Sequence, residues 1–264
     1  MKIAIYYYSG AGNTRYIARL LRKQFIEDGD SVIFTRIVKS TQFDLQCGDV
    51  DLLLVGFPVY DLSAPLMVQK FVATLPCSDV PIAFFCTRAM ISVNAVLELK
   101  NIAMKSSGMV TVANLDLYMP GTDILGIGTI KNSRTEKIVK SLHSRNIDKK
   151  IKKFIARAKK KRPLAVWTKW YSYLAFLIPP KTRQKFHDQY TKFTSDFYCE
   201  HEACTQCMLC VKNCPQENIA FDGKISFGSS CDMCLRCLHH CPAECIQIGE
   251  MTKGKVRYNK VELL

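Results

Sequence analysis

Two cysteine-rich runs near the end of the chain constrain its fold more than any other feature of its 264 residues. The run "CTQCMLCVKNCP" occupies residues 204–215, and "CDMCLRCLHHCP" repeats its spacing 27 residues later, at 231–242. Each run reads C-x2-C-x2-C-x3-C-P, so three thiols lie at intervals of three residues and a fourth precedes a proline. Nine of the 13 cysteines fall between Cys204 and Cys245. This clustering favours metal ligation in a reducing compartment over a disulfide framework.

A tetrahedral zinc ion is the alternative to an iron–sulfur cluster at these cysteines. Paired C-x2-C motifs also form zinc ribbons, in which the metal takes four ligands. Zinc accounts neither for the third cysteine at the same interval, nor for the fourth before a proline, nor for the duplication of the whole run. The pattern therefore favours two iron–sulfur clusters.

Residues 200–250 resemble a bacterial two-cluster ferredoxin domain, in which the fourth cysteine of each run ligates the cluster of the other run. The resemblance implies two [4Fe-4S] clusters. The ligands of the first cluster are then Cys204, Cys207, Cys210 and Cys241, and those of the second are Cys231, Cys234, Cys237 and Cys214.

The chain departs from that family between the ligands, where glycines are common. Their places are taken by Gln206, Met208, Met233 and Leu235, and we expect altered backbone hydrogen bonds to sulfur and altered potentials. Five other cysteines have no partner spacing and are expected to be small buried side chains. They are Cys47, Cys77, Cys86, Cys199 and Cys245.

The first half of the chain alternates short apolar runs with helical patterns. Five runs are typical of strands: residues 2–8, 31–38, 51–57, 81–86 and 109–117. Helical spacing follows at 17–25, 64–75 and 94–105, and again as an apolar stripe on a lysine-rich helix at 147–158. This order predicts a doubly wound α/β domain with a five-stranded parallel sheet.

A glycine-rich turn, "SGAGNT" at residues 9–14, connects the first predicted strand to the first predicted helix. Backbone N–H groups at a helix N-terminus favour a phosphate. A P-loop requires a lysine that "GNTR" lacks, and a dinucleotide loop requires a third glycine where the chain has Arg15. The turn therefore predicts a phosphate site of another kind.

This turn resembles the phosphate loop of flavodoxins, which holds the terminal phosphate of FMN. The matching residues are Ser9, Gly10, Gly12, Asn13 and Thr14, while Ala11 replaces the usual hydroxyl residue and removes one donor. Ligands of such sheets bind outside the carboxyl ends of the strands. The resemblance therefore adds flavin contacts after the third and fourth strands: Pro58, Val59, Tyr60, Thr87, Arg88 and Ala89.

Two of these contacts have a specific expected role and a plain alternative. Tyr60 is expected to stack on the flavin ring, and Arg88 to line its polar edge with Thr87 and Ala89. The alternative for Tyr60 is a surface aromatic on a turn, and for Arg88 a side chain without any contact to the flavin.

The net charge of +14 is concentrated in one middle segment, since residues 131–192 carry 19 basic and 3 acidic side chains. Within it, residues 163–180 are apolar and aromatic between basic flanks. Their length, end prolines and Lys169 disfavour a membrane span. A linker packed between domains is favoured over a helix lying on a membrane surface. Docking of acidic redox proteins accounts for the charge at least as well as binding of nucleic acid does. The aromatic residues lie in an apolar run, which suits packing better than stacking on bases.

Together these features resemble the family of flavodoxin–ferredoxin fusions. The expected domains are 1–160, an FMN-binding flavodoxin-like domain; 161–195, a basic and aromatic linker; and 196–264, a small α+β ferredoxin domain. The resemblance implies electron transfer between FMN, two clusters and an external partner. The alternatives are a flavin-dependent reductase of a small substrate and a redox sensor on a membrane or nucleic acid. The N-terminal residues show no cleavage site, so a cytoplasmic protein is expected.

Overall fold

A computed structural model describes residues 1–43, 49–60, 62–76, 79–89, 92, 95–122, 130, 134, 137, 144–164 and 192–258. Residues 165–191 of the predicted linker lie outside these ranges, as do Cys47 and Cys77. None of the helices within these ranges combines the length and apolar character needed to cross a bilayer. Below, the N-terminal domain means the described residues of 1–164, and the C-terminal domain means 192–258.

The N-terminal domain contains a five-stranded, entirely parallel sheet. Its strands are β1 (Lys2–Tyr7), β2 (Ser31–Arg36), β3 (Leu52–Pro58), β4 (Ile82–Arg88) and β5 (Thr111–Tyr118). They are ordered β2-β1-β3-β4-β5. This is the flavodoxin-like doubly wound arrangement, so the predicted fold class is confirmed.

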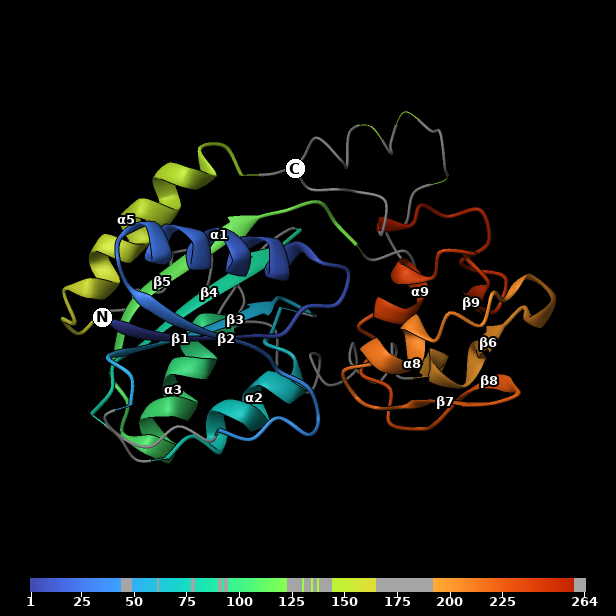
Figure 1. The fold of residues 1–264 in the computed structure, drawn as a ribbon, viewed down its shortest axis with the longest axis horizontal. Coiled ribbons are helices and arrows are strands. Elements are labelled where there is room, and N and C mark those ends of the chain that lie inside the picture. The colour runs from blue at the N-terminus through green and yellow to red at the C-terminus, as the bar shows by residue number, and fades with distance from the viewer. Residues whose placement is uncertain are drawn as a thin grey trace, which may run out of the picture.

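Helices cover both faces of this sheet (Figure 1). The helices α1 (Asn13–Glu27) and α5 (Ile147–Lys159) pack on one face, and α2 (Leu66–Ala73) and α3 (Ala95–Ser107) pack on the other. The apolar stripe predicted for α5 faces the sheet, because Ile151, Phe154 and Ala158 are all buried. α2 begins two residues later than predicted, because Pro65 is its N-cap and has an extended backbone.

The C-terminal domain is small and contains short elements. Strand β6 (Phe197–Cys199) pairs antiparallel with β9 (Ile246–Ile248), and β7 (Ile219–Asp222) pairs antiparallel with β8 (Lys224–Phe227). Helices α8 (Leu209–Asn213) and α9 (Arg236–His240) each follow two cysteines of a run, and 3-10 turns η1 (Lys192–Asp196) and η2 (His201–Ala203) flank β6. α8 and α9 are 27 residues apart in sequence, as are the starts of β7 and β9, so the sequence duplication is also a structural one.

The C-terminal domain lies against the carboxyl ends of the parallel strands (Figure 1). After β2, the Lys39 N–H donates to the Pro215 carbonyl at 2.8 Å, and the Ser40 hydroxyl donates to Glu217 at 2.6 Å. After β5, the Thr122 carbonyl contacts the ring nitrogen Nε2 of His239 at 2.8 Å. The edge at which ligands of doubly wound sheets bind is therefore the edge that faces the cysteine runs.

Candidate cofactor site between the two domains

The glycine-rich turn, residues 9–14, leads into α1 as predicted, and we call it the phosphate loop after the site predicted for it. Gly12 is the N-cap of α1 with φ +123°, and as a glycine it offers no side-chain cap of its own. The Ser9 hydroxyl accepts the N–H of Arg15 at 3.3 Å, and the Asn13 side-chain amide donates to the Pro120 carbonyl at 2.9 Å. These two side chains hold the shape of the turn, so the backbone N–H groups at the start of α1 before Arg15 are the donors best suited to a phosphate.

Thr87 joins the turn to the ends of β3 and β4. Its hydroxyl contacts the hydroxyl of Thr14 at 2.8 Å, and both side chains are buried. Its carbonyl accepts the N–H of Val59 at 2.8 Å, and Pro58 pairs with Thr87 in the sheet. The structure thus brings these residues together at one edge, although the Thr14 hydroxyl is engaged inside the fold.

Arg88 is held within the sheet by an acidic neighbour. Its Nε donates to Asp116 at 2.5 Å, and its guanidinium lies 5.7 Å from the ring centre of Tyr118. These contacts favour the alternative given above for Arg88, a side chain that does not contact the flavin. Ala89 lies close to Gly121, at the end of the same edge.

Tyr60 lies where the two domains meet. A Cβ atom placed on Gly10 would lie 2.5 Å from the Tyr60 hydroxyl and would overlap the carbonyl oxygen of Cys234. The Tyr60 ring meets the ring of Tyr8 edge-on, with centres 6.4 Å apart. Burial raises the pKa of Tyr60 well above its usual value, and the neighbouring Cys234 raises it further, so the phenol is neutral. The stacking role of Tyr60 stays a prediction, and its hydroxyl contacts the phosphate loop.

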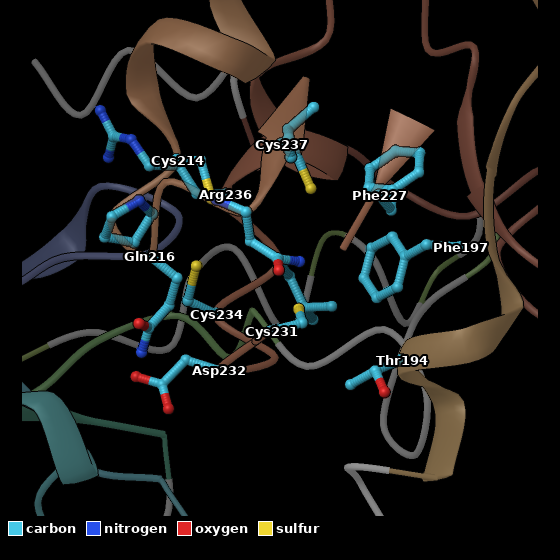
Figure 2. A pocket seen from close by; sticks show the side chains of 14 residues that line it. Thr194, Phe197, Cys214, Gln216, Phe227, Cys231, Asp232, Cys234, Arg236 and Cys237 are labelled. Atoms are coloured by element: carbon cyan, nitrogen blue, oxygen red, sulfur yellow. The ribbon is translucent and has the colours of Figure 1, made fainter. Parts of the chain in front are cut away.

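One cavity of the C-terminal domain adjoins this junction, and we call it the inner cavity. It is lined by Cys214, Cys231, Cys234 and Cys237, with Phe197 and Phe227 at one side (Figure 2). The cysteine side chains come from both runs and surround a shared space (Figure 2). Three cysteines of the second run and the fourth of the first run therefore meet here. The ligand assignment itself stays a prediction.

Backbone N–H groups approach the sulfur atoms of the inner cavity. The Asn218 N–H donates to the Cys214 sulfur at 3.3 Å, and the Met233 N–H donates to Cys231. Burial nevertheless raises the pKa of Cys231 to about 12 and that of Cys234 to about 11. In the absence of a metal these thiols are protonated, so binding of a metal centre must release their protons.

Four residues between the cysteines, at positions where we noted that glycine is common in two-cluster ferredoxins, all have left-handed backbones. Their φ angles are 53° at Gln206, 59° at Met208, 48° at Met233 and 57° at Leu235. A side chain in this conformation costs roughly 1–2 kcal/mol per residue. These turns therefore form without glycine, at a cost in conformational energy.

A second cavity, which we call the outer cavity, lies among the other four predicted ligands, Cys204, Cys207, Cys210 and Cys241. Cys199 and Cys245 also line it. The sulfur of Cys245 lies 3.6 Å from that of Cys199 and 3.4 Å from that of Cys241. The sulfur atoms of Cys199, Cys204 and Cys245 all lie within 4.8 Å of one another.

The expectation that Cys86, Cys199 and Cys245 are buried is confirmed. The sequence reasoning missed that the last two reach the wall of the outer cavity. Their proximity in sequence to Cys204 and Cys241 was the available signal, since a metal-binding loop brings its immediate neighbours with it.

Sequence reasoning also missed the residues of the C-terminal domain that contact the phosphate loop. Nη1 of Arg236 donates to the carbonyl oxygens of Ser9 at 3.1 Å and Gly10 at 3.0 Å. Tyr8, which follows β1, donates to Asp232 at 3.4 Å. Burial, and then the charge of Arg236, lowers the pKa of His240 to about 4, so that imidazole is neutral at neutral pH. The sequence contained a signal for these contacts, because the two cysteine runs carry different residue types at Asp232, Arg236 and His240 and at the positions equivalent to them.

No protein-family model and no curated protein sequence matches the chain. Among solved structures, Flavodoxin 2 from Bacillus cereus is 17% identical with a TM-score of 0.44, over 61% of this chain and 99% of that chain. A flavodoxin from the domain Archaea is 15% identical with a TM-score of 0.43, over the same shares. Rubredoxin oxygen:oxidoreductase from Desulfovibrio gigas is 16% identical with a TM-score of 0.38, over 61% of this chain and 36% of that chain. The fold assignment rests on the strand order itself.

Proposed function

We propose that this protein is an electron carrier whose N-terminal domain binds FMN and whose C-terminal domain binds two [4Fe-4S] clusters. One observation carries the proposal. The loop that resembles a flavin phosphate site is in direct contact with the segment that contributes Cys234 to the inner cavity. Two sites that each suit a redox group therefore share a wall.

The residues at the loop fit an anionic group. The start of α1 offers backbone donors, and Arg236 brings a positive charge to the same turn. Among the described residues, Nε of Arg236 and Nε2 of His240 are buried without a hydrogen-bond partner. FMN bound here would supply transfer of one or two electrons beside centres that each pass one electron. Pro58, Val59 and Thr87 lie at the sheet edge where the rest of the flavin would be held.

The lining of the two cavities supports the assignment of iron–sulfur clusters. Each is lined by the four cysteines of one predicted ligand set. In the inner cavity, backbone N–H groups also donate to the sulfurs, as they do around clusters whose potentials the protein sets.

The cavities differ in what they adjoin, and this suggests separate tasks. The inner cavity borders the phosphate loop, whereas Cys207 of the outer cavity is exposed. We assign exchange with the flavin to the inner cluster and exchange with an external partner to the outer one. The excess of basic side chains in the chain suits an acidic redox protein as that partner.

Anaerobic purification tests the proposal directly. We expect about one FMN and about eight iron atoms per chain, with reductive titration bleaching flavin and cluster absorbance in separate steps. Zinc in place of iron would contradict the clusters. Iron without flavin, even after incubation with FMN, would contradict the flavin site.

A flavin-dependent reductase and a redox sensor remain the competing functions. Turnover of a small electron acceptor without a protein partner would favour the reductase. Salt-sensitive binding to DNA or anionic vesicles would favour the sensor.

A further inference from the structure

Arg236 touches both candidate sites at once. It lies between Cys234 and Cys237 in the second run, and its guanidinium contacts the phosphate loop. We propose that Arg236 is a positioning residue for the phosphate loop and that it couples FMN affinity to the loading of the inner cavity. This inference rests on the proposed function, and its test separates the two.

The two hydrogen bonds of Arg236 orient consecutive peptide groups. Its Nη1 donates to the carbonyls of Ser9 and Gly10. In a trans peptide the carbonyl and the following N–H point in opposite directions. Arg236 therefore also fixes the direction of the N–H groups of Gly10 and Ala11. The Gly10 N–H meets the Tyr60 hydroxyl. Because Ala11 has no hydroxyl, its backbone N–H is the only donor that this position offers.

The buried charge of Arg236 is not balanced by a carboxylate. The residue is 4% exposed, and no ion pair joins it to an acidic side chain in the part of the chain that the structure describes. Arg15 and Arg36 lie near enough to add positive potential at Arg236. A buried cation without a compensating anion is costly. The arrangement is therefore suited to a phosphate at the loop and to the negative charge of metal-bound thiolates in the inner cavity.

The backbone of Arg236 belongs to the inner cavity. Its N–H donates to the Cys234 sulfur, while its guanidinium points away from the cavity (Figure 2). Metal bound by Cys234 and Cys237 would hold this backbone in place, and loss of the metal would release it. A contact that favours one ligand when the other is bound works in both directions.

The duplicated run provides an internal comparison. The residue equivalent to Arg236 in the first run is Leu209, which is 41% exposed. A cysteine run of this spacing therefore does not require arginine at that position. The requirement arises from the phosphate loop.

Binding of FMN and riboflavin to the full chain tests the proposal. Riboflavin lacks the phosphate, so a loss of loop geometry weakens FMN and spares riboflavin. For Arg236→Gln in the cluster-loaded protein we expect the FMN dissociation constant to rise at least about tenfold, the effect of losing hydrogen bonds from a charged group. The riboflavin constant should stay within about twofold of the wild-type value. The control is Arg257→Gln, because Arg257 is an equally buried arginine, 4% exposed, that donates to Ile246 and Gln247.

Cluster loading tests the coupling. FMN should bind the cluster-loaded wild type more tightly than Cys234→Ser, and this difference should vanish when both proteins also carry Arg236→Gln. Equal loss of FMN and riboflavin, or no loss of either, would overturn the positioning role. If Arg236→Gln retains no iron, the FMN dissociation constant is measured on Arg236→Lys instead, because lysine keeps the positive charge but lacks the rigid guanidinium that donates to two carbonyls. Wild-type FMN affinity in Arg236→Lys would also contradict the inference. A wild type that binds no FMN contradicts the proposed function instead.

Discussion

The two cysteine runs have the same spacing and very different surroundings. Around the inner cavity, residues between the ligands contact the N-terminal domain: Asp232 contacts Tyr8, Arg236 contacts the phosphate loop, and His239 contacts the Thr122 carbonyl. Their equivalents in the first run are Thr205, Leu209 and Lys212. The cysteines thus recur at the same spacing, whereas the residues between them differ where one run meets the carboxyl edge of the parallel sheet.

The outer cavity differs from the inner one in its sulfur content and exposure. It is lined by Cys199 and Cys245 in addition to the four predicted ligands, and its Cys207 is exposed. Among the described residues that line the inner cavity, the four predicted ligands are the only cysteines. A cluster bound in the outer cavity would be close to solvent and accessible to a protein partner, and the additional buried sulfurs would alter its hydrogen bonding and potential.

The largest expected effect comes from replacing the fourth cysteine of either run by serine. Cys214→Ser should remove about four of eight iron atoms and should affect the inner cluster, while Cys241→Ser should affect the outer one, because each lines the cavity of the other run. Iron analysis and low-temperature electron paramagnetic resonance of both variants measure this. Only the Cys214 variant should lose fast reduction of the outer cluster by flavin. The reverse assignment would show that each run ligates its own cluster.

A second prediction compares the two glycines of the phosphate loop. Gly10→Ala should destabilise the protein by about 3 kcal/mol or more, because the added methyl overlaps the Cys234 carbonyl at the domain junction. Gly12→Ala meets open space and should cost about 1–3 kcal/mol from its backbone φ of +123° alone. Thermal unfolding under anaerobic conditions measures both. Equal losses would indicate that the Cys234 segment does not press on the loop.

A third prediction concerns the additional sulfurs of the outer cavity. Cys199→Ala and Cys245→Ala should keep about eight iron atoms, since the predicted ligand sets are complete without them. Each should shift the potential of the outer cluster and leave that of the inner cluster unchanged, because only the outer cavity contains them. Potentiometric titration of the two clusters measures this. Loss of iron in either variant would make that cysteine a ligand.

The smallest effect is expected at Leu209, the residue of the first run that is equivalent to Arg236. Leu209→Arg places in the first run the residue of the second, at an exposed position. Stability should change by no more than about 0.5 kcal/mol, and FMN affinity should not change. Tighter FMN binding in this variant would mean that positive charge anywhere on the C-terminal domain is sufficient and that the hydrogen bonds of Arg236 are not required.

Local sequence patterns predicted most of the fold and the types of site. Alternation of apolar runs with helical spacing depends on neighbours a few residues apart, and all five predicted strands form the expected parallel sheet. The cysteine spacing and the absence of a lysine or third glycine from "SGAGNT" are equally local. The sequence therefore determined the fold class, the eight cysteines with ligand spacing and the position of the glycine-rich turn before α1.

The tertiary structure alone decided how these parts meet. The contact of Arg236 with Ser9 joins residues 227 positions apart, and no periodic pattern reports such a contact. The placement of Tyr60 against Gly10 and of Arg88 against Asp116 likewise depends on which loops converge at the carboxyl edge. Spacing along the chain specifies which residues share a strand, a helix or a metal-binding loop. Complementarity between two folded surfaces specifies which of them touch, because docking depends on shape and charge that exist only after each domain has folded.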